Sequence, residues 1–268
     1  MNDKMILKKA RNAKMLEERL AKNINFQKID LVEWIFDKTE IMEGSNILEF
    51  CCGVGTQTLH LANLAGVNGH IFALDVSREA LEKLSGKIEP GLRKSVTIIE
   101  SEMDVFHIAL KNEHISPPYF DLIFCSYGLY YSNNLKELLK EAKSWLKPTG
   151  KFVVIGPFGP NNNQVYDFLE KGEVIIPDSV KYVSSEFMHS KAIPWFSKHF
   201  ETVNISTVVN EVRWEAPGEF ITYWKNSTFY DPKKKRIIEE LLDEHFKNFP
   251  SFINEKWVIM IEAKNMRS

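Results

Sequence analysis

A short turn rich in small residues is the part of the sequence best suited to chemistry. It lies within NILEFCCGVGTQTLHLA, which starts at Asn46, and its Gly53 and Gly55 permit a tight turn in which a ligand can press against bare backbone. Thr56 follows and can cap the helix expected behind the turn. Twenty residues after Gly55, at the end of the next apolar segment, Asp75 is placed to accept hydrogen bonds from a ribose diol. The spacing therefore predicts a site for a cofactor that carries a ribose.

Several of these residues also have purely structural interpretations. Asp75 can be an ordinary cap for the helix of SREALEKL, although Ser77 can serve as that cap as well. Cys51 and Cys52 are adjacent, Cys125 is the third cysteine, and none lies in a CxxC pair. A disulfide framework or a metal site is therefore not expected, and small packing residues are the commoner role for such cysteines.

The elements that must position this turn follow an alternating pattern from Ser45 to Pro157. Nearly continuous apolar runs predict strands at 46–50, 70–76, 95–100, 119–126 and 151–156, with helices near 56–65, 77–87 and 133–147. Such alternation is typical of a parallel sheet covered by helices on both faces, so the fold class is α/β and doubly wound. In such sheets ligands bind at the carboxyl ends of the strands, which is where the turn lies.

The two ends of the chain extend this core. Apolar stripes through Ile6, Ala10, Ala13, Leu16 and Leu20, and through Ile29, Val32 and Phe36, predict two N-terminal helices. After the core we expect a short helix near 164–171, a helix near 185–200, a strand at 201–209, helices at 217–225 and 232–249, and a final strand at 256–264. We expect one domain over 1–268, with an N-terminal helical segment at 1–40, a cofactor-binding core at 45–157, and a remainder at 158–268 that contains a helical cap at about 210–250.

Two cofactors use a turn of this kind. A nicotinamide dinucleotide wants G-x-G-x-x-G, and reading from Gly53 the third position is Thr58, so that fingerprint is incomplete. The acidic Glu49 followed by small residues at Cys51, Gly53 and Gly55 instead resembles the E/D-x-G-x-G-x-G signature of the class I S-adenosylmethionine-dependent methyltransferases. Cys51 departs from that signature, because it stands where the family usually has its first glycine.

The resemblance covers roughly residues 25–157. LKELLKEAKSWLKPTGKFVVIG is similar to the family's helix, Leu-Lys-Pro-Gly-Gly turn and fifth strand, with Thr149 in place of the first glycine of the turn. The layout after residue 158 is similar to the small-molecule branch that includes quinone-biosynthesis C-methyltransferases. The resemblance implies a Rossmann-like seven-stranded sheet, mostly parallel with an antiparallel last strand, and a helical cap inserted between the last two strands.

The resemblance also implies roles for individual residues. It places Glu49 near the methionine amino group, Asp75 on the ribose hydroxyls and the ESEMD segment beside adenine, where we expect Glu102 and Met103 rather than Ser101 or Asp104. The full set expected to contact S-adenosyl-L-methionine, or its product S-adenosyl-L-homocysteine, is Glu49, Cys51, Gly53, Gly55, Thr56, Asp75, Val76, Glu102, Met103, Ser126 and Tyr127.

The chemistry that this cofactor supplies makes few demands on acid or base groups. A sulfonium methyl is already activated, so the protein must orient the acceptor in line with it and exclude water. Tyr130 and Tyr131 follow the fourth predicted strand and are the candidate acceptor-positioning residues, although tyrosines there can equally be core. No residue is predicted as general base, and the sequence does not identify the acceptor or the atom methylated.

The acceptor region is expected in the tail. Eight aromatic residues gather there: Trp195, Phe196, Trp214, Phe220, Tyr223, Trp224, Phe229 and Tyr230. Such residues suit the wall of a pocket for a small organic acceptor, or equally the core of the cap itself. We expect the N-terminal helices and the insertion to close over the acceptor as a lid.

Charge and composition limit the possible partners. Lys plus Arg total 34 against 36 Asp plus Glu, a net charge of −2, so no basic surface favours nucleic acid. No apolar run is long enough to span a membrane and no secretion signal is evident, so a cytoplasmic protein without membrane insertion is expected. Ser116 to Asp121 (SPPYFD) mimics a DNA-methyltransferase box but precedes its strand, so it is interpreted as a loop. A small-molecule methyltransferase is favoured over a catalytically silent cofactor-binding protein and over an RNA or protein methyltransferase; the oligomeric state is left open.

Overall fold

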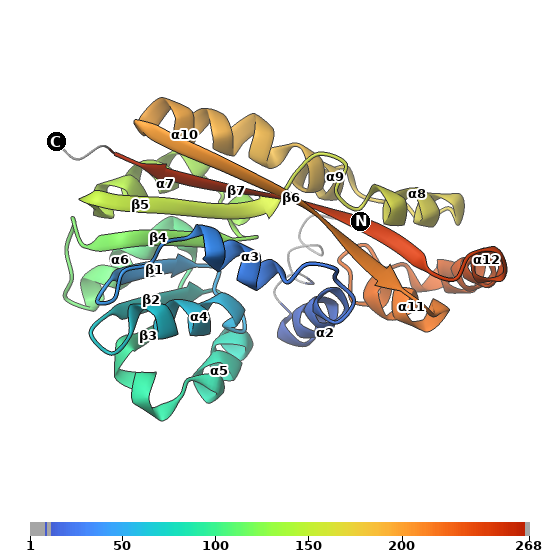
Figure 1. Cartoon of the computed structure of the whole chain (residues 1–268), viewed down its shortest axis with the longest axis horizontal. Helices are drawn as coiled ribbons and strands as arrows, with labels where there is room; N and C mark the ends of the chain where they lie inside the picture. Colours follow the sequence, from blue (N-terminus) through green and yellow to red (C-terminus); the bar gives the residue numbers. More distant parts are fainter. Residues whose placement is uncertain (1–8, 10–11, 266–268) are drawn as a thin grey trace. The chain divides into compact units, whose positions relative to one another are not determined.

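Seven strands form one sheet in the order β3-β2-β1-β4-β5-β7-β6. Their bounds are β1 Asn46–Phe50, β2 His70–Asp75, β3 Val96–Glu100, β4 Phe120–Ser126, β5 Leu146–Pro157, β6 Thr202–Trp214 and β7 Phe252–Lys264. β3, β2, β1, β4 and β5 pair in parallel, and β7 runs opposite to β5 (Figure 1). The expected sheet, mostly parallel with an antiparallel last strand, is confirmed. The computed structural model describes residue 9 and residues 12–265.

The described chain divides into two compact units, each assembled from separate segments. The sheet unit comprises Ile35–Gly156, His189–Ser206 and the described part of Ile259–Ser268. The helical unit comprises the described part of Met1–Trp34, Pro157–Met188 and Thr207–Val258. β6 and β7 each contribute residues to both units.

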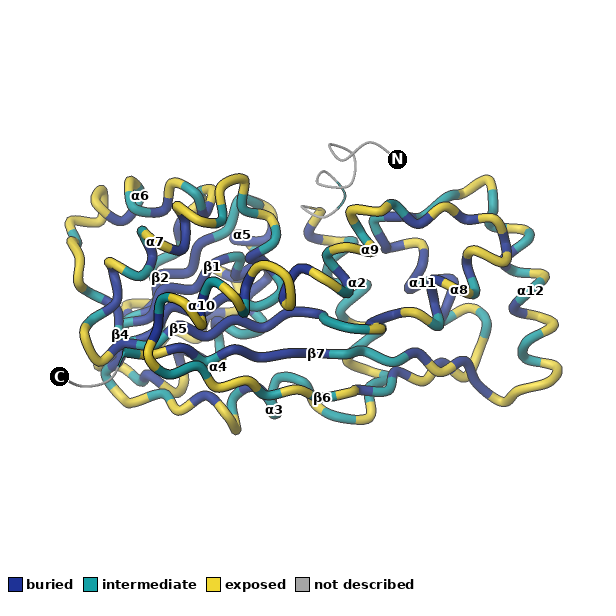
Figure 2. The backbone as a smooth tube through the Cα atoms, turned by 90° about the horizontal axis from the view of Figure 1, so that it is seen from above, coloured by how far each residue is buried: buried dark blue, intermediate teal, exposed yellow. Residues whose placement is uncertain are grey.

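In the sheet unit the parallel strands are buried on both faces, as their near-continuous apolar sequences predict. Ile47, Leu48 and Phe50 of β1, together with Phe124 of β4 and Val153 of β5, have no exposed surface, and the tube in Figure 2 is dark over these strands. The helices of this unit are α3 Leu31–Lys38, α4 Thr56–Ala65, α5 Arg78–Lys87, α6 Phe106–Asn112, α7 Leu135–Trp145 and α10 Ile193–His199. The first four residues of α3 lie in the helical unit.

The helical unit has an aromatic core of its own. Its helices are α2 Ala13–Ile24, α8 Asn163–Lys171, α9 Asp178–Ser185, α11 Pro217–Lys225 and α12 Lys235–Asn248, and α11 and α12 fill the chain between β6 and β7. α2 packs against α11. Trp214, Phe220 and Trp224 have no exposed surface and form one cluster with Ile238 and Leu242 of α12. The predicted helical cap is therefore confirmed as a folded body between the last two strands.

Some elements differ from the sequence prediction. α6 and α9 were not expected, and the helix expected near 185–200 is a π-helical turn at Met188–Ala192 followed by α10. β6 continues five residues beyond the predicted end at Val209, because Asn210 is held by tertiary contacts: its side chain accepts from Ile29 N at 2.9 Å and donates to Ile29 O at 2.8 Å. The two N-terminal helices are present, although Ile6 and Ala10 of the first stripe lie outside the described residues.

Candidate cofactor site

The turn after β1 has the backbone conformation that its small residues predict. Cys51, Gly53 and Gly55 all lie in the left-handed region, with φ of +56°, +54° and +85°. A Cβ on Gly55 would stand 2.2 Å from Leu84 Cδ1 of α5, so only glycine fits there without displacing that side chain. Gly55 is therefore required for the packing of Leu84 against the turn, and its backbone is covered on that side.

Thr56 does not cap α4, which corrects the sequence prediction. Gly55 occupies the N-cap position without a side-chain cap, and Thr56 is the first residue of the helix. Because Gly55 is the N-cap, Thr56 lies one residue past the position from which a side-chain hydroxyl accepts from the first turn.

Asp75, the last residue of β2, ties the turn to the neighbouring strand. Its Oδ2 accepts from Gly53 N at 2.9 Å, and its Oδ1 accepts from Ser77 N at 2.8 Å. Ser77, not Asp75, caps α5, since its hydroxyl accepts from Ala80 N at 3.4 Å. Each oxygen of a carboxylate can accept two hydrogen bonds, so Asp75 retains acceptor capacity for a ligand hydroxyl.

Glu49 is the most buried ionisable group of the site, with 2% of its surface exposed. Burial raises the pKa of Glu49 to about 8; the Asp75 charge acts in the same direction and the Thr58 hydroxyl opposes it. The carboxyl is therefore largely protonated at neutral pH and can donate as well as accept a hydrogen bond.

Three buried polar atoms around the carboxyl ends of β1 and β4 lack hydrogen-bond partners within the described residues. They are Glu49 Oε2, Thr58 Oγ1 and Ser126 Oγ. Buried polar atoms are nearly always paired in folded proteins. These three unpaired atoms lie at the edge of the sheet where α/β proteins bind ligands, so they indicate a site for a polar ligand.

The segment after β3 holds the residues predicted beside adenine. Glu102 precedes a 3₁₀ turn at Met103–Val105, and Met103 is buried. The Asp104 carboxylate accepts from Ser132 Oγ at 2.5 Å and from Asn133 N at 2.8 Å, so it is engaged with the segment after β4. Asp104 is thus held by the segment after β4, and the placement of Glu102 and Met103 beside adenine stays a prediction.

The residues predicted after β4 lie at the same edge of the sheet. Tyr127 has a left-handed φ of +54°, and its N–H donates to Ile155 O of β5 at 2.8 Å. Tyr130 and Tyr131 form a 3₁₀ turn with their rings 4.7 Å apart, edge to face, and Tyr131 is 39% exposed. An exposed ring beside a half-buried one is compatible with a surface that receives an acceptor.

Two residues of this edge were not singled out from the sequence. Thr58 appeared only as the mismatch to the dinucleotide fingerprint, yet its hydroxyl faces Glu49. Lys87, at the end of α5, donates from Nζ to Val54 O of the turn at 3.2 Å. No local pattern marks a lysine one helix away as a support of the turn, so this contact is a tertiary feature.

The aromatic residues of the tail do not form one wall, which corrects the expectation of an aromatic acceptor pocket. Trp195 and Phe196 belong to the sheet unit, where Phe196 packs on Phe152 with ring centroids 5.2 Å apart. Trp214 and Phe220 are fully buried in the helical unit. They serve as the core of that unit, because a small helical body needs large apolar side chains to exclude water.

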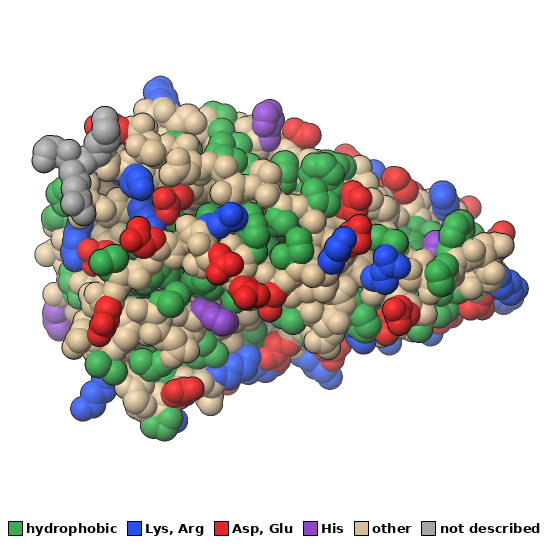
Figure 3. Space-filling view, viewed as in Figure 1, with side chains coloured by type: hydrophobic (Ala, Val, Ile, Leu, Met, Phe, Trp, Pro, Cys, Tyr) green, Lys and Arg blue, Asp and Glu red, His purple; other side chains and the backbone are tan. Residues whose placement is uncertain are grey.

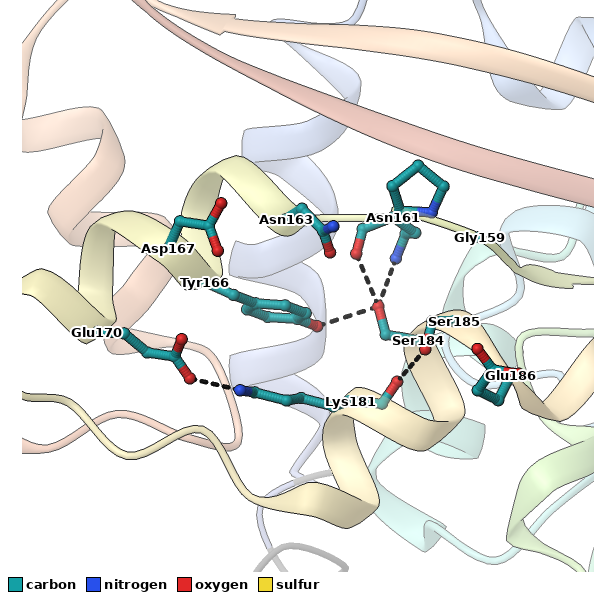
Figure 4. Close-up of a pocket in the computed structure, with 11 residues that line it drawn as sticks. Gly159, Asn161, Asn163, Tyr166, Asp167, Glu170, Lys181, Ser184, Ser185 and Glu186 are labelled. Atoms are coloured by element: carbon teal, nitrogen blue, oxygen red, sulfur yellow. Dashed lines mark hydrogen bonds and ion pairs between the residues drawn. The ribbon is translucent and has the colours of Figure 1, made fainter.

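A groove of about 460 Å³ lies in the helical unit between α8 and α9 (Figure 4). Its floor is a hydrogen-bonded set in which the Ser184 hydroxyl meets Tyr166 OH at 3.1 Å and Asn161 Nδ2 at 2.8 Å, and an ion pair of Glu170 with Lys181 spans its edge at 2.5 Å. The buried polar side chains of this floor are paired with one another, and the groove contains none of the predicted site residues.

Comparison with known proteins identifies the fold of the site. Residues 47–150 match the family described as methyltransferase domain. The YcgJ protein of Bacillus subtilis superimposes with a TM-score of 0.59 at 15% identity, over 88% of this chain and 98% of that one. The demethylmenaquinone methyltransferase of Lactococcus lactis is 26% identical over 69% of this chain and 70% of that protein. The matched segment contains the turn after β1, β2, β3 and β4, so the candidate cofactor site lies within a methyltransferase domain.

The similarity to curated relatives is concentrated in the cofactor core. The demethylmenaquinone methyltransferase of Lactobacillus johnsonii is 28% identical over 47% of this chain, and the chain spans half (50%) of that relative's length. Within residues 9 and 12–265, no helix is long and apolar enough to cross a membrane. Over the same residues, no cluster of three or more His, Cys, Asp or Glu side chains is arranged to hold a metal ion.

Proposed function

We propose that this protein transfers a methyl group from S-adenosylmethionine to a small organic acceptor of the quinol type. The observation that carries the proposal is the set of unpartnered polar atoms of Glu49, Thr58 and Ser126 beside the glycine turn after β1. An amino acid joined to a nucleoside has polar ends and a flat base, and its polar groups can pair with these orphaned atoms.

Each cofactor-contacting residue has a task that its geometry supports. Asp75 accepts the ribose hydroxyls on its remaining lone pairs while Gly53 N and Ser77 N hold its orientation. Protonated Glu49, with the neighbouring Thr58, meets the methionine end, and Met103 provides an apolar surface for the base. Cys51 and Thr56 contribute backbone at either end of the turn, and Val76 and Glu102 border the nucleoside.

When bound, the cofactor supplies an activated sulfonium methyl. The protein's part is to hold an acceptor atom in line with that methyl and to exclude water. Tyr131 presents an exposed ring for an aromatic acceptor to stack on, Tyr130 supports that ring, and Ser126 and Tyr127 shape the backbone beside it. Transfer to a hydroquinone carbon releases a proton, and an acidic acceptor can give that proton to solvent without a dedicated base.

The acceptor class rests on the relatives and on charge. The relatives named above act on demethylmenaquinone, a quinone-type small molecule. The net charge is −2, and on the face drawn in Figure 3 acidic and basic side chains are interspersed rather than segregated. That face has no continuous basic stripe that could bind the phosphate backbone of RNA, so a small acceptor is preferred to RNA.

We further propose that acceptor selectivity resides in the helical unit. That unit contains the insertion between β6 and β7, and α2 packs on its helix α11, so the N-terminal segment and the insertion behave as one body. Removing residues 1–30, which leaves Ile35 and Phe36 of the sheet unit in place, is expected to lower turnover and raise the KM for the acceptor while leaving affinity for S-adenosylhomocysteine unchanged. Unchanged turnover and acceptor KM would refute this assignment.

Calorimetry tests the cofactor assignment directly. S-adenosylhomocysteine is expected to bind, and the Asp75→Ala variant is expected to bind about 1–3 kcal/mol more weakly because buried hydrogen bonds to the ribose are lost. Glu79→Ala, on the exposed face of α5, is the matched control and should bind as the parent does. Absence of binding of either S-adenosylmethionine or S-adenosylhomocysteine at millimolar concentration would overturn the proposal.

Radiolabelled transfer tests the acceptor class. With tritiated-methyl S-adenosylmethionine, a reduced 1,4-naphthoquinone is expected to take up label, and total RNA is not. Tyr131→Ala is expected to raise the KM for the quinol and leave S-adenosylhomocysteine affinity intact. Cofactor binding without label on any fraction of a metabolite extract would instead identify a catalytically silent binding protein.

A further inference from the structure

Two of the three cysteines meet at the carboxyl edge of the sheet. Phe50 of β1 lies opposite Cys125 of β4 in the parallel register, and Cys51 is the next residue along β1. Neighbouring strands are about 4.8 Å apart and one residue advances the chain by about 3.3 Å, which puts the two Cα atoms about 6 Å from each other. That separation lies within the range that disulfides span.

The two thiols also point toward each other. The two thiols lie close enough that Cys125 raises the pKa of the Cys51 thiol. Both sulfurs lie close to Gly128. A Cβ placed on that glycine would be 2.6 Å from Cys51 Sγ and 3.2 Å from Cys125 Sγ. The absence of a side chain at Gly128 is therefore what gives the pair its space. Cys52, although adjacent in sequence, directs its thiol to Gly53 O at 4.0 Å.

The pair combines one reachable thiol with one protected thiol. Cys51 is partly exposed, whereas Cys125 has no exposed surface. This is the arrangement in which an oxidant reaches the first sulfur and the second sulfur resolves the product before further oxidation occurs.

We propose that Cys51 and Cys125 form a reversible oxidation site, closed as an intramolecular disulfide by peroxide-class oxidants. The Cys51 thiol reacts with hydrogen peroxide to give the sulfenic acid and one water. The Cys125 thiol then displaces the hydroxyl of that sulfenic acid, which releases a second water and forms the S–S bond. Two thiols are oxidised, one peroxide is reduced to two waters, and a dithiol reductant reverses the change by exchange.

The rate of closure is set by the surroundings of Cys51. Cys125 and burial raise the pKa of the Cys51 thiol, and the nearby Asp75 and Cys52 act in the same direction. Because the thiolate is the reacting form, oxidation is slow near neutral pH and accelerates as the pH rises.

The position of Cys51 links this site to the cofactor. Cys51 opens the turn on which the proposed function places S-adenosylmethionine, so this step of the inference rests on that function. A ligand bound over the turn covers the reachable sulfur. Saturating S-adenosylhomocysteine is therefore expected to slow disulfide formation severalfold.

The test uses the full-length reduced protein treated with hydrogen peroxide at about pH 9. The expected product is a monomer lighter by two hydrogens, with a Cys51–Cys125 linked peptide in a non-reducing digest and full recovery after dithiothreitol. The matched control Cys52→Ala should form the same link, whereas Cys51→Ala and Cys125→Ala should not lose the two hydrogens. If a variant fails to fold, the peptide map of the wild-type protein still tests whether the Cys51–Cys125 link forms.

The outcomes separate this inference from the proposed function. A Cys51–Cys52 link, an intermolecular dimer, or sulfinic acid at Cys51 without any link would overturn the oxidation site. A Cys51–Cys125 link that forms equally fast with and without S-adenosylhomocysteine, at a concentration shown by calorimetry to saturate the protein, would uphold the thiol pair and contradict the placement of the cofactor over Cys51.

Discussion

The two units bury ionisable groups in opposite ways. In the sheet unit Glu49 is buried with an unpartnered carboxyl oxygen, and burial raises its pKa to about 8. In the helical unit Lys256 donates from Nζ to Asn162 Oδ1 at 2.6 Å and to Tyr223 OH at 3.0 Å, and burial together with nearby Arg19 lowers its pKa to about 7. The fold leaves one carboxyl oxygen of Glu49 without a hydrogen-bond partner, whereas it supplies two partners to the Lys256 ammonium group. Burial alone therefore does not distinguish these two groups; the unmet hydrogen bond of Glu49 does.

The largest predicted effect is on the pH dependence of stability through Glu49. Its folded pKa is above its unfolded value, so its contribution to stability is complete below about pH 4.5 and is lost as the pH rises through about 8. The free energy of unfolding should fall by up to about 5 kcal/mol over this window. Glu49→Gln should remove this fall in urea titrations at a series of pH values. An unchanged slope in the variant would mean that Glu49 ionises freely in the fold.

The next effect concerns the turn itself. Gly55→Ala places a Cβ against Leu84 Cδ1 at a residue with φ of +85°, and we expect a loss of about 2–4 kcal/mol together with weaker S-adenosylhomocysteine binding. Gly86→Ala in α5 is the control: nothing lies within 4 Å of its Cβ, so helix propensity should stabilise the protein by up to about 1 kcal/mol. Equal effects of the two substitutions on unfolding would contradict the steric explanation.

Lys256 should give a pH dependence of opposite sign. Its folded pKa is below the unfolded value of 10.5, so its contribution is complete above pH 10.5 and is lost as the pH falls through about 7. The free energy of unfolding should therefore rise with pH between these values. Lys256→Met should flatten that rise, while Lys14→Met on the exposed face of α2 should leave it in place. A rise that persists in Lys256→Met would assign it to other groups.

The smallest effect is predicted on the surface of α12. Arg236 pairs with Glu240 at 2.9 Å, and the Arg236 side chain is 91% exposed. Arg236→Ala should change stability by less than about 0.5 kcal/mol, because exposed ion pairs of this spacing contribute little. It should also leave methyl transfer to the quinol unchanged; a clear loss of transfer would show that this basic segment serves more than solvation.

The sequence predicted most of what local periodicity controls. β1 and α4 begin and end where the apolar runs predict, and α11 matches its expected bounds of 217–225. The turn between β1 and α4 was predictable because Gly53 and Gly55 mark backbone conformations that other residues avoid.

The remainder depends on tertiary contacts that leave no local pattern. α6 is seven residues long with only Phe106 and Leu110 buried, too short for a helical stripe to stand out. The orphaned hydroxyls of Thr58 and Ser126 and the meeting of Cys51 with Cys125 arise from pairing between elements distant in sequence. Whether an aromatic residue of the tail is part of a core depends on which unit encloses it. Composition does not show which unit a residue belongs to.

The interleaving of the two units along the chain has a consequence for biosynthesis. The sheet unit starts at Ile35 yet takes its last residues from Ile259 onward, and the helical unit is completed only at Val258. Cleavage at one peptide bond cannot separate the two units, and each unit includes segments that are synthesised after parts of the other. Because β5 ends at Pro157 and its sheet neighbour β7 begins only at Phe252, the nascent protein carries an open sheet edge at β5 until β7 has been synthesised, which predicts slow maturation and dependence on chaperones during synthesis.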